Sequence, residues 1–243
     1  MPRFLDFSAA FRGENPITRV YFNGSVNDIG LAQRYFTRID ASSKGFSMPL
    51  PISLGSSSTA IRVRMGFIGA VSGRIRPAFS SATYIELDRF SNTIDFRYSS
   101  AGPSADLIAH EEIYDDGSIV EYLLTFNDST VEGFVNGVSI GTTSRTPTAQ
   151  QVDSVFSTGS SGSSVIYPLS VEAWAGTTDV NSEPDFKCLF DSDGTGTEEV
   201  DVIGGNNPQR VGMTSADTEL FTYDSSSSSW KNSDESVVLP VTY

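Results

Sequence analysis

Two aspartates two residues apart are the strongest candidates for metal chemistry in this sequence. Asp191 and Asp193 open the segment Asp-Ser-Asp-Gly-Thr-Gly. Carboxylate oxygens at this spacing, next to flexible glycine, can wrap around Ca²⁺. The segment does not complete an EF-hand loop, because the twelfth position is Val202 rather than glutamate. An ordinary turn, in which Asp accepts hydrogen bonds from nearby backbone N–H groups, explains the same residues and is the interpretation that we favour. Ca²⁺ is the one cofactor that the sequence leaves open.

The sequence contains few histidine and cysteine residues that could take part in nucleophilic catalysis or bind zinc. The chain has one histidine, His110, and one cysteine, Cys188. A Ser-His-Asp triad would have to use His110, which stands in a polar segment, and no Gly-x-Ser-x-Gly stretch has the strand-to-helix context of a nucleophile elbow. One histidine and one cysteine cannot complete a structural zinc site. The alternating pattern around Cys188 predicts a strand with a buried thiol. We therefore expect a protein that is not an enzyme.

Aromatic rings beside polar groups could bind a glycan. The candidates are Trp174, Trp230 and Tyr223, with Tyr84 and Tyr114 as further possibilities. Trp174 alternates with Val171 and Ala173, so we expect it on the outer face of its strand, exposed to solvent. Trp230 follows a run of serines and is either exposed or anchors the last strand. Packing in a core or on a sheet is the alternative for each, because most aromatic residues of a sandwich serve that purpose.

Short strands must position these residues. In residues 60–69 the side chains of Ile61, Val63 and Met65 alternate with arginines or glycine, which gives one dry and one wet face. Residues 84–90 and 93–99 are expected to pair through a turn at Ser91-Asn92. Asn136-Gly137 joins two further strands through a type I′ turn, because both residues tolerate φ > 0.

Two other stretches are less regular. Pro168 interrupts a strand pattern over residues 164–176 and indicates an edge strand or a bulge. Residues 26–35 give a weak helix pattern, the best in the chain. Strands alternating with helices are absent from the pattern, so the sequence predicts an all-β sandwich or barrel.

The composition of the chain disfavours several classes of binding partner. The 243 residues carry a formal net charge of −14, which disfavours nucleic acids and anionic membranes. No stretch is apolar and long enough to span a membrane. The first sixteen residues lack the apolar core of a signal peptide, so we expect synthesis in a reducing cytoplasm.

Three segments carry a resemblance to a known superfamily. Residues 121–143 run through a polar turn into Phe-Val-Asn-Gly and close on Gly-Thr, residues 35–55 place apolar residues and proline after a turn, and residues 190–207 contain Phe-Asp, Gly-Thr and Gly-Gly in order. Together they resemble the laminin-G-like, concanavalin A-like jelly rolls. The resemblance implies a two-sheet antiparallel jelly-roll sandwich. The missing signal peptide favours the branch of that superfamily found in bacteriophage structural proteins.

The same resemblance implies a test for catalysis. Laminarinase-type glycosidases of the superfamily place three carboxylates along one strand, in the pattern Glu-x-Asp-x-(x)-Glu. This chain has Glu199 and Asp201, but Gly204 stands where the second glutamate is required. Without that proton donor a retaining mechanism cannot run. The resemblance therefore implies a non-catalytic member.

We expect one jelly-roll domain over residues 35–243, preceded by an N-terminal arm or extra strand over residues 1–34. The expected function is a virion structural subunit of a bacteriophage, a capsid decoration or fibre- or tail-associated protein, whose partners are other virion proteins or copies of itself. The alternative is a glycan-binding module for attachment to a host surface, and a divergent polysaccharide-degrading glycosidase comes last.

Overall fold

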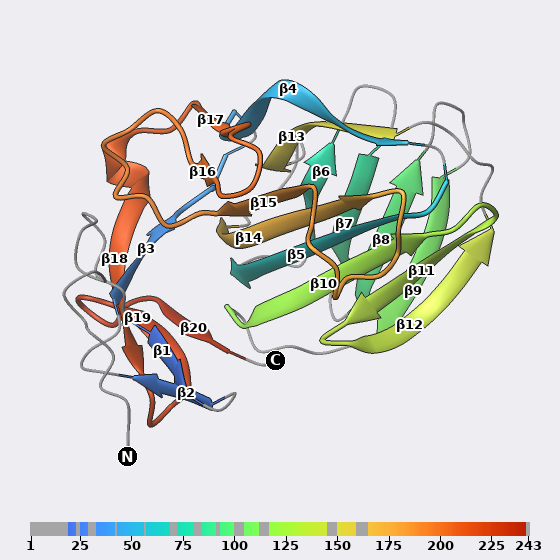
Figure 1. The fold of residues 1–243 in the computed structure, drawn as a ribbon. Helices are drawn as coiled ribbons and strands as arrows, with labels where there is room; N and C mark the ends of the chain where they lie inside the picture. Colours follow the sequence, from blue (N-terminus) through green and yellow to red (C-terminus); the bar gives the residue numbers. More distant parts are fainter. Residues whose placement is uncertain are drawn as a thin grey trace, which may run out of the picture.

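The fold is an all-β, two-sheet antiparallel jelly-roll sandwich with a smaller sheet at one end (Figure 1). This confirms the fold class expected from the sequence. The computed structural model describes residues 19–22, 25–28, 33–41, 43–55, 57–68, 72–79, 84–90, 93–99, 105–111, 117–144, 150–158 and 165–241. This described part of the chain contains no helix that could traverse a bilayer.

The sheet drawn in front in Figure 1, here called the front sheet, has the strand order β12-β11-β10-β5-β14-β15-β16. All of its neighbouring strands are antiparallel. Its strands are β5 Thr59–Ile68, β10 Ile119–Phe126, β11 Thr130–Val135, β12 Val138–Ser144, β14 Val165–Ala175, β15 Phe186–Leu189 and β16 Val200–Asp201.

The back sheet has the order β17-β4-β13-β6-β7-β8-β9 and is also antiparallel. Its strands are β4 Gly45–Gly55, β6 Ser72–Phe79, β7 Tyr84–Phe90, β8 Thr93–Ser99, β9 Ala105–Glu111, β13 Gln150–Thr158 and β17 Gln209–Val211. The expected pairing of residues 84–90 with 93–99 is confirmed, since Phe90 of β7 stands opposite Thr93 of β8.

The small sheet has the order β20-β19-β18-β3 and contains β3 Gln33–Thr37, β18 Thr218–Asp224, β19 Ser229–Asn232 and β20 Val238–Pro240. A separate hairpin joins β1 Arg19–Phe22 to β2 Ser25–Asp28, and the 3₁₀ helix η2 Ser215–Asp217 precedes β18. The helix expected over residues 26–35 is wrong, because β2 and β3 occupy its ends. Pairing of β3 with β18 and burial of Phe36 outweigh the weak local helix pattern. The division of the chain at residues 34 and 35 stays a prediction.

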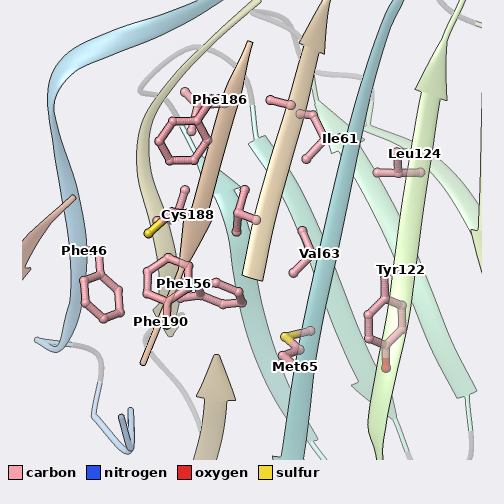
Figure 2. Close-up of a cluster of buried hydrophobic side chains, with 14 of the residues drawn as sticks. Phe46, Ile61, Val63, Met65, Tyr122, Leu124, Phe156, Phe186, Cys188 and Phe190 are labelled. Carbon is pink, nitrogen blue, oxygen red and sulfur yellow. The ribbon is translucent and has the colours of Figure 1, made fainter. Parts of the chain in front are cut away.

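The main core lies between the front and back sheets (Figure 2). Ile61, Val63 and Met65 of β5 are all at most 3% exposed, as their alternation predicted. Phe190 packs against Phe46 and Phe156 with ring centroids 4.7 and 4.9 Å apart. Burial of these rings from both sheets supplies the hydrophobic free energy that holds the sandwich together.

Two local expectations are confirmed at the level of the backbone. Asn136 and Gly137 have φ of 48° and 76° and connect β11 to β12, as the type I′ turn requires. Pro168 lies beside a register shift between β14 and β5, so the bulge alternative is correct and the edge alternative is wrong. β14 runs between β5 and β15 in the interior of the front sheet.

Candidate functional site

A short antiparallel ladder joins the edges of the two large sheets. It consists of residues 197–199, which lead into β16 of the front sheet, and residues 208–210, which include the start of β17 of the back sheet. Glu198 stands opposite Gln209. The N–H of Glu199 donates to the carbonyl of Pro208, and the N–H of Arg210 donates to the carbonyl of Thr197, both at 2.8 Å. Because side chains alternate along such a ladder, neighbouring residues face different surroundings.

One residue of each ladder strand points inward and forms a buried ion pair. The side chains of Glu199 and Arg210 are 0% and 3% exposed, and their closest charged atoms lie 2.5 Å apart. Ser192, Thr37 and Thr218 accept further hydrogen bonds from the guanidinium. Burial raises the pKa of Glu199 above its ordinary value, although the Arg210 charge and the Ser192 hydroxyl act in the opposite direction. This pair ties the ladder to β3 and β18 of the small sheet.

The loop between the two ladder strands is organised by Asp201. Its buried carboxylate accepts hydrogen bonds from the backbone N–H groups of Lys187, Ile203, Gly204 and Asn206, at 3.0 to 3.3 Å. The side-chain oxygen of Asn207 in turn accepts the N–H of Asp201 at 3.0 Å. A loop bonded at this many points has few alternative conformations, so the side chains that it carries are held in place before any ligand arrives.

A depression of about 200 Å³ opens on the outer side of this loop. We call it the amide pocket. Its lining consists of Pro49, Leu50, Glu198, Gly204, Gly205, Asn206, Asn207 and Gln209. The Glu198 carboxylate accepts hydrogen bonds from Asn207 at 3.1 Å and from Gln209 at 2.9 Å. Asn206 bonds to both the N–H and the carbonyl of Leu50, at 3.1 and 2.7 Å. The planar polar groups are thus locked against one another.

Glu198 and Gln209 present free acceptors to the amide pocket, while Asn206 and Asn207 each keep one amide proton that no described residue accepts. Both amide protons of Gln209 are used, on Glu198 and on the carbonyl of Asn207, while none of the described groups donates to its Oε1. Each oxygen of Glu198 accepts one described hydrogen bond and has a further lone pair. The Leu50 side chain beside them is 69% exposed. The pocket therefore offers acceptors for hydroxyl protons next to an apolar surface.

Trp174 lies on the predicted face of β14 but is not exposed. It shares that face with Glu172, as the alternation predicted, yet the residue is only 1% exposed. Its indole N–H donates to the carbonyl of Ser182 at 2.9 Å, and the Arg62 guanidinium lies 4.9 Å from its ring centre. The expectation of an exposed ring is wrong because residues 176–185 return across this face between β14 and β15 (Figure 1).

The other two aromatic candidates belong to the core beneath the small sheet. Trp230 is 5% exposed and packs against Phe36, with ring centroids 5.6 Å apart. It stands opposite Leu239 of β20, so it anchors the last strand, the second of the two alternatives. Tyr223 is half-buried against Trp230. Tyr114 lies outside the described residues, and only the backbone of Tyr84 in β7 is described.

The two calcium candidates lie on the loop before the ladder. Asp193 is exposed and accepts hydrogen bonds from both the N–H and the hydroxyl of Thr195, at 3.0 and 2.7 Å. These bonds lower the pKa of Asp193, and they form the turn that we favoured from the sequence. Asp191 is half-buried. Within the described ranges no three acidic, histidine or cysteine side chains gather around one point. Ca²⁺ binding here stays a prediction.

Glu199 and Asp201, the remaining members of the glycosidase pattern, both have structural partners. Glu199 faces the interior and pairs with Arg210, and Asp201 is 6% exposed and bonded to the backbone of its loop. Gly204 N–H is one of the donors to Asp201, so the position of the missing glutamate is part of the same loop. Neither carboxylate is placed to reach a sugar bond.

Sequence reasoning missed the residues of the amide pocket. Within residues 190–207 the sequence directs attention to the turns and to Asp191, Asp193, Glu199 and Asp201, and none of these four acidic residues lines this pocket. The available signal was the run Gly-Gly-Asn-Asn-Pro at residues 204–208, which predicts a tight loop rich in amides. Nothing local indicates that this loop meets Leu50, which is more than 150 positions away.

The chain is similar to known proteins in fold alone. No family model and no curated protein matches the chain. Among solved structures, it resembles a native heptameric SAP-like pentraxin from Limulus polyphemus, with 12% identity over 75% of this chain and 96% of that one and a TM-score of 0.45. It also resembles the binding domain of botulinum neurotoxin DC in complex with SialylT, with 10% identity and a TM-score of 0.43. That similarity covers 67% of this chain and 49% of the toxin domain, so the chain spans about half its length. Sheep galectin-11 is similar at 11% identity over 51% and 94% of the two chains, with a TM-score of 0.37.

Proposed function

We propose that the chain is a glycan-binding module and that the amide pocket holds one sugar ring. The observation that carries the proposal is the set of locked acceptors, Glu198 and Gln209, beside the exposed Leu50. Sugar hydroxyls are donors that match those acceptors, and the C–H groups of a pyranose ring can cover the leucine. Because these side chains are already ordered, binding costs little conformational entropy.

The pocket suits neutral sugars rather than acidic ones. Glu198 is the charged residue in its lining, and the chain carries a formal net charge of −14. A carboxylate or sulfate on the ligand would be repelled by Glu198, and no described cation belongs to the lining to offset that repulsion. The ligands that fit are neutral hexoses and their N-acetyl derivatives, at the end of a glycan.

A glycan array comparing the wild type with Gln209→Leu tests the proposal. Loss of Gln209 removes one acceptor and releases Glu198, so we expect binding to neutral glycans to weaken about tenfold, the value of one lost hydrogen bond. Gln151→Leu is the matched control, because Gln151 is an exposed glutamine on β13 of the back sheet. Absence of binding to any neutral glycan, or equal binding by wild type and Gln209→Leu, would overturn the proposal.

The role in a bacteriophage virion stays a prediction from the sequence, together with the virion location and partners that it implies. No contact among the described residues and no comparison bears on assembly. The prediction is tested by the composition of purified particles: a structural subunit is present in a constant number of copies per particle, whereas a free glycan-binding protein remains in the soluble fraction.

A further inference from the structure

A second and larger depression opens on the other side of the ladder. Its volume is about 470 Å³, within the range of small-molecule sites. We call it the hydroxyl pocket. Its lining consists of Gly194, Thr195, Gly196, Thr197, Arg210, Met213, Thr214 and Ser215. Four of these eight residues carry a hydroxyl group, and no carboxylate belongs to the lining.

Two hydroxyl groups of the lining each donate their proton to a nearby carboxylate. The Thr195 hydroxyl donates to Asp193 at 2.7 Å, and the Thr214 hydroxyl donates to Asp217 at 3.3 Å. Hydrogen bonds from Thr195 lower the pKa of Asp193. Burial would raise the pKa of Asp217, but Lys44 and Thr214 outweigh it and lower the pKa. Both carboxylates are therefore ionised at neutral pH and can only accept, so each threonine hydroxyl uses its proton on a carboxylate and has only lone pairs to offer a ligand. One lone pair of Thr214 accepts the backbone N–H of Asp217 in the capping box of η2, which leaves the other.

The floor of the hydroxyl pocket does not attract anions. Arg210 is the cation in the lining, but Glu199 compensates its charge at 2.5 Å and its side chain is 3% exposed. Asp217 is likewise compensated, by Lys44 at 2.5 Å, whereas the exposed Asp193 forms no ion pair with any described cation. An anionic ligand would meet the charge of Asp193 and two hydroxyls whose protons are already used, whereas a ligand rich in O–H donors would be satisfied.

We propose that the hydroxyl pocket is a second binding site for a neutral polyhydroxylated ligand, so that each chain binds two sugar rings, one on each side of the ladder. That the ligand is a sugar rests on the function proposed for the amide pocket. Two sites on one small domain allow a branched or repeated glycan to be held at two points, which raises avidity without any new contact.

An NMR titration separates the two sites, because each has its own glycine reporters. The amide signal of Gly196 reports on the hydroxyl pocket and that of Gly205 on the amide pocket. The probes are the methyl glycosides of glucose, galactose, mannose and N-acetylglucosamine, with methyl glucuronide as the anionic comparison. We expect both signals to shift with at least one neutral glycoside, each with its own dissociation constant.

Substitutions in each pocket show which pocket causes each NMR shift. Thr195→Val combined with Thr214→Val keeps the shape of the walls and removes both acceptors, so binding reported by Gly196 should weaken tenfold or more while binding reported by Gly205 is unchanged. Gln209→Leu should do the reverse. Thr142→Val, at an exposed threonine of β12, is the control and should change neither. Thr197→Val gives an independent test of the hydroxyl pocket if the double variant folds poorly.

The outcomes distinguish the two proposals. A shift of Gly205 alone overturns the second site and leaves the glycan-binding function intact. A shift of Gly196 alone supports the second site and overturns the assignment of the amide pocket. No shift at either reporter overturns the proposed function and the second site with it. Tighter binding of the glucuronide than of the glucoside at Gly196 overturns the ligand class.

Discussion

Two glutamates have buried carboxylates, Glu172 on the outer face of the front sheet and Glu199 in the ladder. They differ in the number and the exposure of the cations that pair with them. The glutamate side chains are 4% and 0% exposed. Glu172 pairs with two cations, Arg62 at 2.5 Å and Lys187 at 2.8 Å, and Lys187 is 35% exposed. Glu199 has a single cation, Arg210, which is as hidden as the glutamate itself.

The pKa values of the two carboxyls move in opposite directions. Burial alone would raise the pKa of Glu172, but its bond to Lys187 and the charge of Arg62 outweigh it, so the pKa falls below the ordinary value. Burial dominates at Glu199, whose pKa rises. The comparison shows that a second, partly solvated cation is enough to keep a buried carboxylate in its charged form, whereas a sealed pair does so at a cost in desolvation.

The two regions also differ in what they do for the surface. Trp174, on the same face as Glu172, donates its indole N–H to Ser182 of the covering residues 176–185, and the Glu172 ion pairs join β14 to β5 and β15. The Glu199 pair lies beneath an open ladder with a depression on each side. Glu198 and Gln209 immediately precede the two members of this pair in their strands, so the pair fixes the backbone that carries both side chains of the amide pocket.

Replacing Arg210 should have the largest effect. Arg210→Leu leaves the Glu199 carboxylate buried without a partner, and we expect the free energy of unfolding to fall by about 4 kcal/mol. Arg62→Leu is the matched change in the other region. It should lower the same quantity by about 1 kcal/mol, because Glu172 keeps Lys187. Urea denaturation measures both, and equal losses would show that the second cation makes no difference.

Trp174→Ala should have the second largest effect on the free energy of unfolding. The indole is buried between Arg62 and residues 176–185, so its removal leaves a cavity and should lower the free energy of unfolding by about 3 kcal/mol. Its glycan binding should match that of the wild type under conditions where both are folded. A loss of glycan binding in a folded Trp174→Ala variant would place a binding site on the covered face and contradict the division between the two regions.

Two glycines allow the same substitution to be made in each region. Gly176 and Gly194 have φ of +77° and +79°, so alanine is strained at both, by about 1 kcal/mol. A Cβ at Gly176 would meet nothing within 4 Å, whereas a Cβ at Gly194 would lie 2.6 Å from the Thr218 hydroxyl and 3.3 Å from Arg210. We expect Gly194→Ala to cost about 1 kcal/mol more than Gly176→Ala in thermal or urea unfolding, since it also disturbs the ion pair. Similar losses in the free energy of unfolding for both variants would mean that Thr218 and Arg210 move aside for the added Cβ at little cost.

The dependence of stability on pH should separate the two carboxyls by sign. The pKa of Glu172 is lower in the folded state than in the unfolded state. Its ionised form therefore stabilises the fold at pH values above the unfolded-state pKa, and this stabilisation is lost as the pH falls through the folded-state pKa. Because the folded pKa of Glu199 is raised, its protonation on acidification stabilises the fold, between the folded pKa and the unfolded value near 4.5. Unfolding of Glu172→Gln and Glu199→Gln between pH 3 and 7 should therefore deviate from wild type in opposite senses. Deviations of the same sign would contradict this assignment.

Local pattern predicted most of the fold and little of the site. The alternation around Val63 and the Asn136-Gly137 turn depend on neighbours in the chain, so a period of two and a preference for φ > 0 were sufficient. The same alternation gave the correct face for Trp174. Its burial could not be predicted, because the covering residues 176–185 show no periodic pattern of their own.

The amide pocket depends on contacts between distant segments. Leu50 comes from β4, and Glu198 and Gln209 come from two ladder strands separated by a loop. Only the pairing of both strands with their sheets, and the bonds that Asp201 makes to the backbone, bring them together. A propensity for turns at residues 204–208 predicts that the chain reverses there, but not which surface it meets.

The contact between Asn206 and Leu50 has a consequence for solubility. Within β4, only Gly45–Ser47 pair with β17, so the N–H and carbonyl of Leu50 lie on the part of the β4 edge beyond β17. An edge of this kind, carrying an exposed leucine, is a template on which a strand of another molecule can add. The Asn206 amide occupies both backbone groups as a neighbouring strand would, and Pro49 and Pro51 on either side have no N–H to offer. The Asn206 side chain thus satisfies the two edge groups that an additional strand would satisfy. Replacing Asn206 would leave these groups free to pair with a strand of another molecule, which favours edge-to-edge aggregation.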